Sequence, residues 1–97
     1  MTLRQVLPLM LLVASPSLAQ ATEPNLLAGA CQGCHGAGGQ GVGGIPAIKD
    51  THGRDEFVAI MRAFRANQRE ATVMGRIARG YTEEQIDLLA AHFARAQ

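Results

Sequence analysis

The residues with the clearest chemistry stand in one short segment, Cys31-Gln32-Gly33-Cys34-His35. Two thiols at this spacing can each bond one vinyl group of the same haem, and the adjacent imidazole can then ligate the iron. The Cys-x-x-Cys-His spacing is typical of c-type haem attachment. The chain has 2 cysteines in all, and both belong to this segment. The sequence therefore predicts one covalently attached haem c, held by Cys31 and Cys34 and ligated by His35.

Other sites that use cysteine pairs fit the sequence less well. A structural zinc site takes about four ligands, whereas the remaining histidines, His52 and His92, are far apart in the sequence. A thioredoxin-like redox pair belongs in a βαβ context, and no stretch of the chain has a strand pattern. A simple disulfide would leave the adjacent histidine unexplained. Haem attachment is the interpretation that uses all three residues.

Four side chains are candidates for the second axial bond to the iron: Met61, Met74, His52 and His92. Met61 falls on an apolar helical stripe, so core packing already accounts for it. His52 lies in a polar turn where solvation is expected, and His92 flanks the stripe of the last helix near the surface. Met74 lies in a segment expected to be an extended loop, where no helical stripe requires a methionine. The sequence favours Met74 as the distal ligand.

Further residues can support a bound haem. A haem-ligating imidazole usually donates its second N–H to an oxygen acceptor, which fixes the ring. The carbonyl of Pro46 is a candidate acceptor for His35, although a proline in this position can also simply end a loop. The propionates need polar or cationic partners, and the candidates are Gln68, Arg69, Arg76 and Arg79, although a solvated surface position also accounts for each of them.

Hydrophobic periodicity and helix signals predict a mainly helical chain. Helices are expected over 25–33, over about 54–66 and from Thr82 onward, with Asn25 as the N-cap of the first. Residues 67–81 are expected to form a loop that includes at most a short helical turn. Residues 36–44 contain six glycines in nine positions, so this segment is expected to be a loop that brings backbone close to the haem edge. A flexible surface loop is the alternative.

The expected helices have apolar faces. The sequence Thr82-Glu83-Glu84-Gln85 fits a capping box, with acidic residues in the first turn of the helix. In the middle helix the apolar positions are Phe57, Ile60, Met61 and Phe64; in the last helix they are Ile86, Leu89, Ala90 and Phe93. The predicted fold class is all-α, with three to four short helices around one covalently bound haem.

The N-terminus has the pattern of a signal peptide. Arg4 precedes a short apolar stretch, and small residues suited to cleavage follow it, so residues 1–21 are expected to be removed after Ala19 or Ala21. The apolar stretch is shorter than the roughly 20 residues of a membrane span, so no span is expected in the mature chain. Residues 22–97 are then expected to form one small haem-binding domain. Export agrees with haem attachment, which occurs outside the cytoplasm, and predicts a bacterial periplasm.

Charge excludes one class of partner. The chain has a net charge of +1, and loss of Arg4 would leave eight basic and eight acidic residues. A neutral balance without clustered arginines and aromatics does not favour nucleic-acid binding.

The predicted mature domain is small, so it buries little apolar surface by itself. We therefore expect the haem to complete the core and the haem-free chain to be largely unfolded.

The motif, the dipeptide Ile45-Pro46, Met74 and the capped C-terminal helix together resemble a class I cytochrome c. The resemblance covers nearly the whole predicted mature chain. It implies that Pro46 accepts a hydrogen bond from His35 and that Met74 is the distal ligand. It also implies that the last helix crosses the first where Phe93 meets Gly29.

A narrower resemblance covers 57–84, where residues 61–65 and 69–84 are similar to the cytochrome subunits of flavocytochrome c sulfide dehydrogenases. In that family an FAD-containing subunit oxidises sulfide and the haem subunit takes electrons from the flavin. A single motif implies the short, monohaem form. Residues 50–56 depart from the family pattern, which is more apolar at this point.

The resemblance implies a periplasmic carrier of single electrons that is not an enzyme by itself. The leading expectation is the haem subunit of a sulfide-oxidising flavoprotein, with an apolar docking patch that includes Val42, Ile45 and residues near Met74. The alternative is a free electron shuttle between periplasmic redox proteins. A gas-binding haem protein is a third hypothesis, and it requires that Met74 be absent from the iron or labile.

Overall fold

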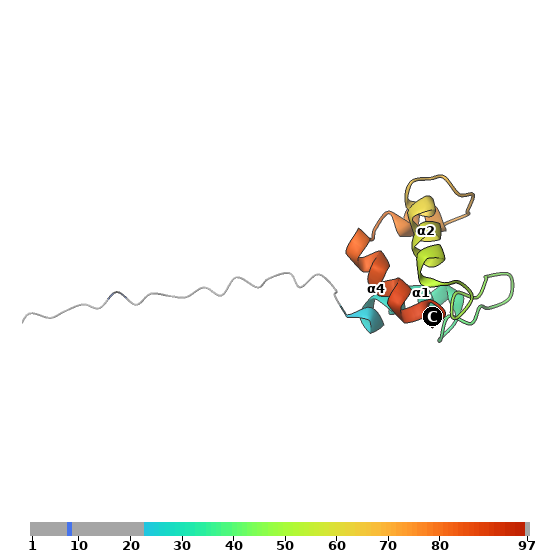
Figure 1. The fold of residues 1–97 in the computed structure, drawn as a ribbon, viewed down its shortest axis with the longest axis horizontal. Coiled ribbons are helices and arrows are strands. Elements are labelled where there is room, and N and C mark those ends of the chain that lie inside the picture. The colour runs from blue at the N-terminus through green and yellow to red at the C-terminus, as the bar shows by residue number, and fades with distance from the viewer. Residues whose placement is uncertain (1–7, 9–22, 97) are drawn as a thin grey trace, which may run out of the picture.

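The computed structural model describes Pro8 and residues 23–96. In this part of the chain the helices are α1 (Pro24–His35), α2 (Arg54–Arg65), α3 (Met74–Ala78) and α4 (Glu83–Phe93) (Figure 1). The predicted signal peptide falls, apart from Pro8, on residues outside the description and stays a prediction. Within the described residues, no helix combines the length and apolar character that a membrane crossing requires.

α4 begins and packs as the sequence predicts. The Thr82 hydroxyl accepts a hydrogen bond from the Gln85 backbone N–H at 3.1 Å, and the Gln85 side chain accepts one from the Thr82 N–H at 3.0 Å. This capping box satisfies backbone donors that the first turn would otherwise leave without partners. The predicted inward stripe is confirmed, because all four of its side chains have no exposed surface: Ile86, Leu89, Ala90 and Phe93.

α1 begins one residue before the expected N-cap. Glu23 occupies the N-cap position without a side-chain hydrogen bond, and Pro24 is the first helical residue. Proline suits this position because its fixed φ matches the helix and its missing N–H would have no partner there. Asn25 therefore lies within the first turn, and the prediction that it caps the helix is wrong.

The described helices pack around α4. α4 contacts both α1 and α2, and α2 contacts α3, whereas α1 and α2 do not pack directly against each other. The rings of Phe57 from α2 and Phe93 from α4 stack with their centroids 6.2 Å apart. Because α1 and α2 both pack against α4 but not against each other, a space remains between them.

The glycine-rich segment packs against the protein itself. Gly39 has φ +80°, and a Cβ there would lie 2.9 Å from the Phe93 ring. Gly29, by contrast, is exposed and has no neighbouring atom within 4 Å of such a Cβ. Phe93 therefore packs on Gly39, and the expectation that it meets Gly29 is wrong. On α1 the fully buried small residue is Ala28.

α3 occupies part of the segment 67–81. It begins at Met74 and has only five residues, so the sequence pattern had too few positions to reveal its apolar face. The expectation that Met74 lies in an extended loop is wrong. Ala78 of α3 is fully buried, and α3 packs against α2. α3 therefore places Met74 beside α2 with a defined helical orientation.

Candidate functional site

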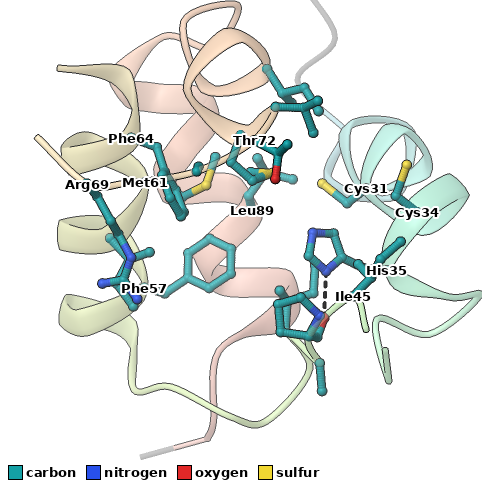
Figure 2. A pocket seen from close by; sticks show the side chains of 18 of the residues that line it. Cys31, Cys34, His35, Ile45, Phe57, Met61, Phe64, Arg69, Thr72 and Leu89 are labelled. Carbon is teal, nitrogen blue, oxygen red and sulfur yellow. Dashed lines mark hydrogen bonds between the residues drawn. The ribbon is translucent and has the colours of Figure 1, made fainter. Parts of the chain in front are cut away.

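A cavity of about 460 Å³ lies between α1 and α2, within the size range of sites for small molecules and cofactors (Figure 2). All four residues of the predicted apolar stripe of α2 line this cavity: Phe57, Ile60, Met61 and Phe64. The stripe therefore contributes both to the core and to the cavity wall. Leu89 of α4 also lines it, and Ile45, Ile48, Val73 and Ile77 complete most of the apolar wall. Side chains of this kind can surround a large, flat, apolar group.

His35 projects into the cavity from the last turn of α1. The side chain is buried, and its Nδ1 lies 2.6 Å from the carbonyl oxygen of Pro46 (Figure 2). A carbonyl oxygen only accepts hydrogen bonds, so Nδ1 donates to Pro46. The proton on Nδ1 leaves the lone pair on Nε2 available for a metal. The Pro46 carbonyl thus holds the imidazole in one orientation and one tautomer.

The backbone that carries Pro46 depends on Gly41. Gly41 has φ +90°, and its N–H donates to the carbonyl oxygen of His35 at 2.6 Å. A Cβ on Gly41 would lie 2.9 Å from the Ala47 nitrogen and 3.0 Å from the Ile45 oxygen. Gly41 thus lets two parts of the loop, the backbone at residue 41 and the backbone at residues 45–47, lie in close contact. Of this segment only Gly44 lines the cavity, so the expected close approach of glycine backbone to the haem edge is limited to that residue.

Cys31 and Cys34 line the cavity from α1, on the side where His35 projects (Figure 2). Burial raises the pKa of the Cys31 thiol, and a hydrogen bond with the Tyr81 side chain opposes this rise. Burial and the same contact with Cys31 raise the pKa of Tyr81. The sequence analysis missed Tyr81 because a contact between residues fifty positions apart leaves no local pattern.

Both candidate methionines line the cavity. Met61 belongs to the buried core, as its place on the α2 stripe predicts. Met74 is half-buried and packs against the same core from the start of α3. The structure therefore brings both thioethers to the space that His35 faces.

The two remaining histidines have different surroundings. His52 lines the cavity, its side chain is 28% exposed, and its Nδ1 lies 2.9 Å from Glu56 Oε1. The expectation that His52 is solvated is therefore met only in part, because the side chain also lines the cavity. His92 is outside the cavity lining, and its ring packs edge-on against Phe93 with centroids 4.7 Å apart.

Ion pairs join the end of α2 to the start of α4. Arg62 Nη2 lies 2.7 Å from Glu83 Oε2, and Arg65 pairs with the other oxygen of the same carboxylate. Arg65 also donates to the carbonyl oxygen of Tyr81 at 3.3 Å. Hydrogen bonds from the two arginines lower the pKa of Glu83. These contacts hold together the two ends of the segment between α2 and α4, which includes α3. The sequence analysis did not predict them.

The donors around the cavity suit a haem of the c type. Two thiols and an oriented imidazole come from α1, apolar side chains surround the space, and thioethers stand elsewhere in the wall. Among the side chains that the structure describes, no three His, Cys, Asp or Glu residues lie close enough together to hold a bare metal ion. The geometry fits a cofactor that brings its own equatorial ligands.

Comparison with known proteins agrees with this geometry. The family model described as cytochrome c matches residues 24–96. The chain is also 38% identical over 84 residues to a protein of Chlorobaculum tepidum described as the cytochrome subunit of sulfide dehydrogenase. That match covers 82% of this chain and 74% of the relative. The chain therefore belongs to the cytochrome c family and is a haem c protein.

Proposed function

We propose that this electron-transfer haem protein is the periplasmic haem subunit that accepts electrons from an FAD-containing, sulfide-oxidising flavoprotein. The observation that carries the proposal is the 38% identity with the Chlorobaculum tepidum cytochrome subunit of sulfide dehydrogenase. The proposal gives the chain no catalytic residue of its own. Sulfide oxidation is assigned to the partner, and this chain receives single electrons.

In this proposal Cys31 and Cys34 hold haem c through two thioether bonds and His35 ligates the iron. Support comes from their common position on α1 and from the 2.6 Å hydrogen bond between His35 and the Pro46 carbonyl. That hydrogen bond orients the Nε2 lone pair toward the cavity. When bound, the haem iron accepts and releases one electron at a time.

Met74 is the proposed distal ligand. It stands at the first turn of α3, half-buried at the cavity, where a short helix and its flanking segments can adjust around the haem. Met61 competes for the role, but this residue is only 6% exposed and belongs to the buried core. A thioether ligand raises the reduction potential relative to a second histidine. With both axial positions filled by side chains, the iron has no open site for substrate.

Exposed apolar side chains beside the cavity supply a docking surface for the partner. Ile45, Val73 and Ile77 line the cavity and are 40%, 53% and 39% exposed, and Val42 nearby is 57% exposed. Exposed apolar side chains that gather in one region mark interaction sites more often than isolated ones do. Docking here would bring the donor close to the edge of the haem.

The first experiment is isolation of the haem-loaded protein from its native periplasm with its bound partners, followed by a flavin assay and a sulfide-reduction assay. A stoichiometric flavoprotein and rapid sulfide-dependent reduction of the haem are expected. A lone monomer that sulfide reduces only slowly would contradict the subunit assignment and favour a free electron shuttle. Absence from the periplasmic fraction would contradict the location.

A pair of variants tests the docking surface. Ile77→Ser should weaken the association, because it removes exposed apolar surface beside the cavity. Leu26→Ser is the matched control, since Leu26 is 70% exposed on α1 but does not line the cavity. Equal binding of both variants to the flavoprotein would place the docking surface elsewhere.

A further inference from the structure

Arg69 differs from the other polar residues that the sequence offers to the haem propionates. Of Gln68, Arg69, Arg76 and Arg79, it alone lines the cavity. Figure 2 shows Arg69 on the α2 side of the cavity, with the space between it and the α1 cysteines. Of the four candidates for contact with a propionate, the structure thus leaves Arg69, which lies on the wall opposite Cys31 and Cys34.

The guanidinium of Arg69 is held in place without a carboxylate partner. Its central carbon lies 5.4 Å from the centroid of the Phe64 ring, within the range of a cation–π contact. Phe64 itself packs against the buried core. Among the described side chains, Arg62 and Arg65 pair with Glu83, but no ion pair involves Arg69. The ring therefore orients a cation whose hydrogen-bond donors remain available.

The chemistry of haem relates this wall to the cysteines. The thioether carbons derive from vinyl groups on one edge of the porphyrin, and the propionates leave from the opposite edge. If Cys31 and Cys34 hold the vinyl edge at α1, the propionate edge faces the far wall. We infer that the Arg69 guanidinium pairs with a haem propionate. This inference rests on the attachment through Cys31 and Cys34 that the proposed function assigns.

The pair positions the haem and tunes its electron affinity. A guanidinium offers a planar set of donors that matches a carboxylate. A nearby cation also favours the reduced haem, because oxidation adds one positive charge. Apart from the residues of α1, the other charged or titratable side chains that line the cavity are Glu70, His52 and Tyr81. The negative charge of Glu70 opposes this effect, His52 is paired with Glu56, and Tyr81 contacts Cys31.

The test is the reduction potential of haem-loaded Arg69→Gln. Measured at the wild-type midpoint, the ratio of reduced to oxidised haem should fall roughly two- to fivefold, which is about 18 to 41 mV for a one-electron couple. Arg69→Lys should recover part of the shift, because it keeps the charge but loses the planar donor set. A potential unchanged in Arg69→Gln would overturn the inference.

Arg76→Gln is the matched control, because it removes the same charge from an exposed arginine of α3 that does not line the cavity. Its shift should be less than half that of Arg69→Gln, and equal shifts would overturn the inference. Denaturing electrophoresis with haem staining separates the two proposals. Haem that leaves the denatured wild-type chain would overturn the attachment and the inference together. Haem that stays, with equal shifts in the two variants, would overturn the inference alone.

Discussion

The two walls of the cavity between α1 and α2 are built differently. On the α1 wall, Cys31, Cys34 and His35 follow one another on a single helix, and the Pro46 carbonyl fixes the imidazole at 2.6 Å. On the α3 wall, Met74 starts a five-residue helix, and ion pairs between exposed side chains close the segment around it. The first wall depends on local spacing and a partly buried hydrogen bond, whereas the second depends on contacts between surface residues distant in sequence.

This difference shows where the site is rigid and where it can adjust. Hydrogen bonds that are shielded from water keep most of their electrostatic strength, whereas exposed ion pairs are screened and contribute little each. We therefore expect the His35 side to keep its geometry under most changes. The Met74 side should respond to smaller perturbations, including those at the surface.

The largest effect should come from removing the haem that both walls share. The double variant Cys31→Ala/Cys34→Ala cannot form thioethers, so the cavity loses the group that completes the core. We expect the haem-free variant to be largely unfolded, because a chain of this size buries too little surface alone. Far-UV circular dichroism measures this. A cooperative, native-like melt would show that the helices fold without haem.

The next effect separates the two methionines. Met74→Leu should lower the reduction potential by on the order of 100 mV, within the range of about 0.8 V that axial ligands span. It should also let carbon monoxide bind the ferrous haem. Met61→Leu is the matched control, since a Met-to-Leu exchange in a core usually costs less than about 1.5 kcal/mol. The reverse pattern would make Met61 the distal ligand.

A smaller effect is expected from the loop that carries Pro46. Gly41→Ala should lower the free energy of unfolding by about 1–3 kcal/mol, because alanine at positive φ is strained and its Cβ would meet backbone atoms. Gly43→Ala is the control, because it shares the positive φ, has no atom within 4 Å of its added Cβ and does not line the cavity. Chemical denaturation of the haem-loaded proteins measures both. Equal losses would show that the close approach at Gly41 is dispensable.

The smallest effect should appear at Glu83. Arg62 and Arg65 lower its pKa, so the ion pairs stabilise the fold above the usual glutamate range and lose this effect as the pH falls through the lowered pKa. Glu83→Gln should therefore reduce the melting temperature slightly at neutral pH and not at acid pH. Glu84→Gln controls for charge in the same first turn of α4. A Glu83→Gln difference that persists in acid would exclude the ion pairs as its cause.

Much of the helical framework follows from local patterns. The capping box at Thr82 and Gln85 and the apolar stripe of α4 appear where the sequence predicts them. The middle helix, expected over about 54–66, spans Arg54–Arg65. Such features depend on residues three or four positions apart, so the linear sequence contains them. The all-α class and the cytochrome c family agree with that prediction.

Apart from the local N-cap error at Asn25, the errors share a physical cause. Phe93 packs on Gly39 instead of Gly29, His52 reaches the cavity with Glu56, and Met74 begins a helix too short to show a periodic face. Each outcome depends on which segments meet in space. Local sequence patterns identify the apolar face of each helix, but they do not identify the segment against which that face packs.

By itself the sequence determined which groups the α1 wall offers, because two thiols and an imidazole stand at neighbouring positions on one helix. The sequence also identified the apolar residues of α2 that line the cavity. Only the tertiary structure decided how the far wall is assembled: that Met61 and Met74 both reach the cavity, and that Arg69 lines it while Arg76 and Arg79 do not. The physical reason is that this wall forms from segments distant in sequence, and their meeting depends on how the helices pack on α4.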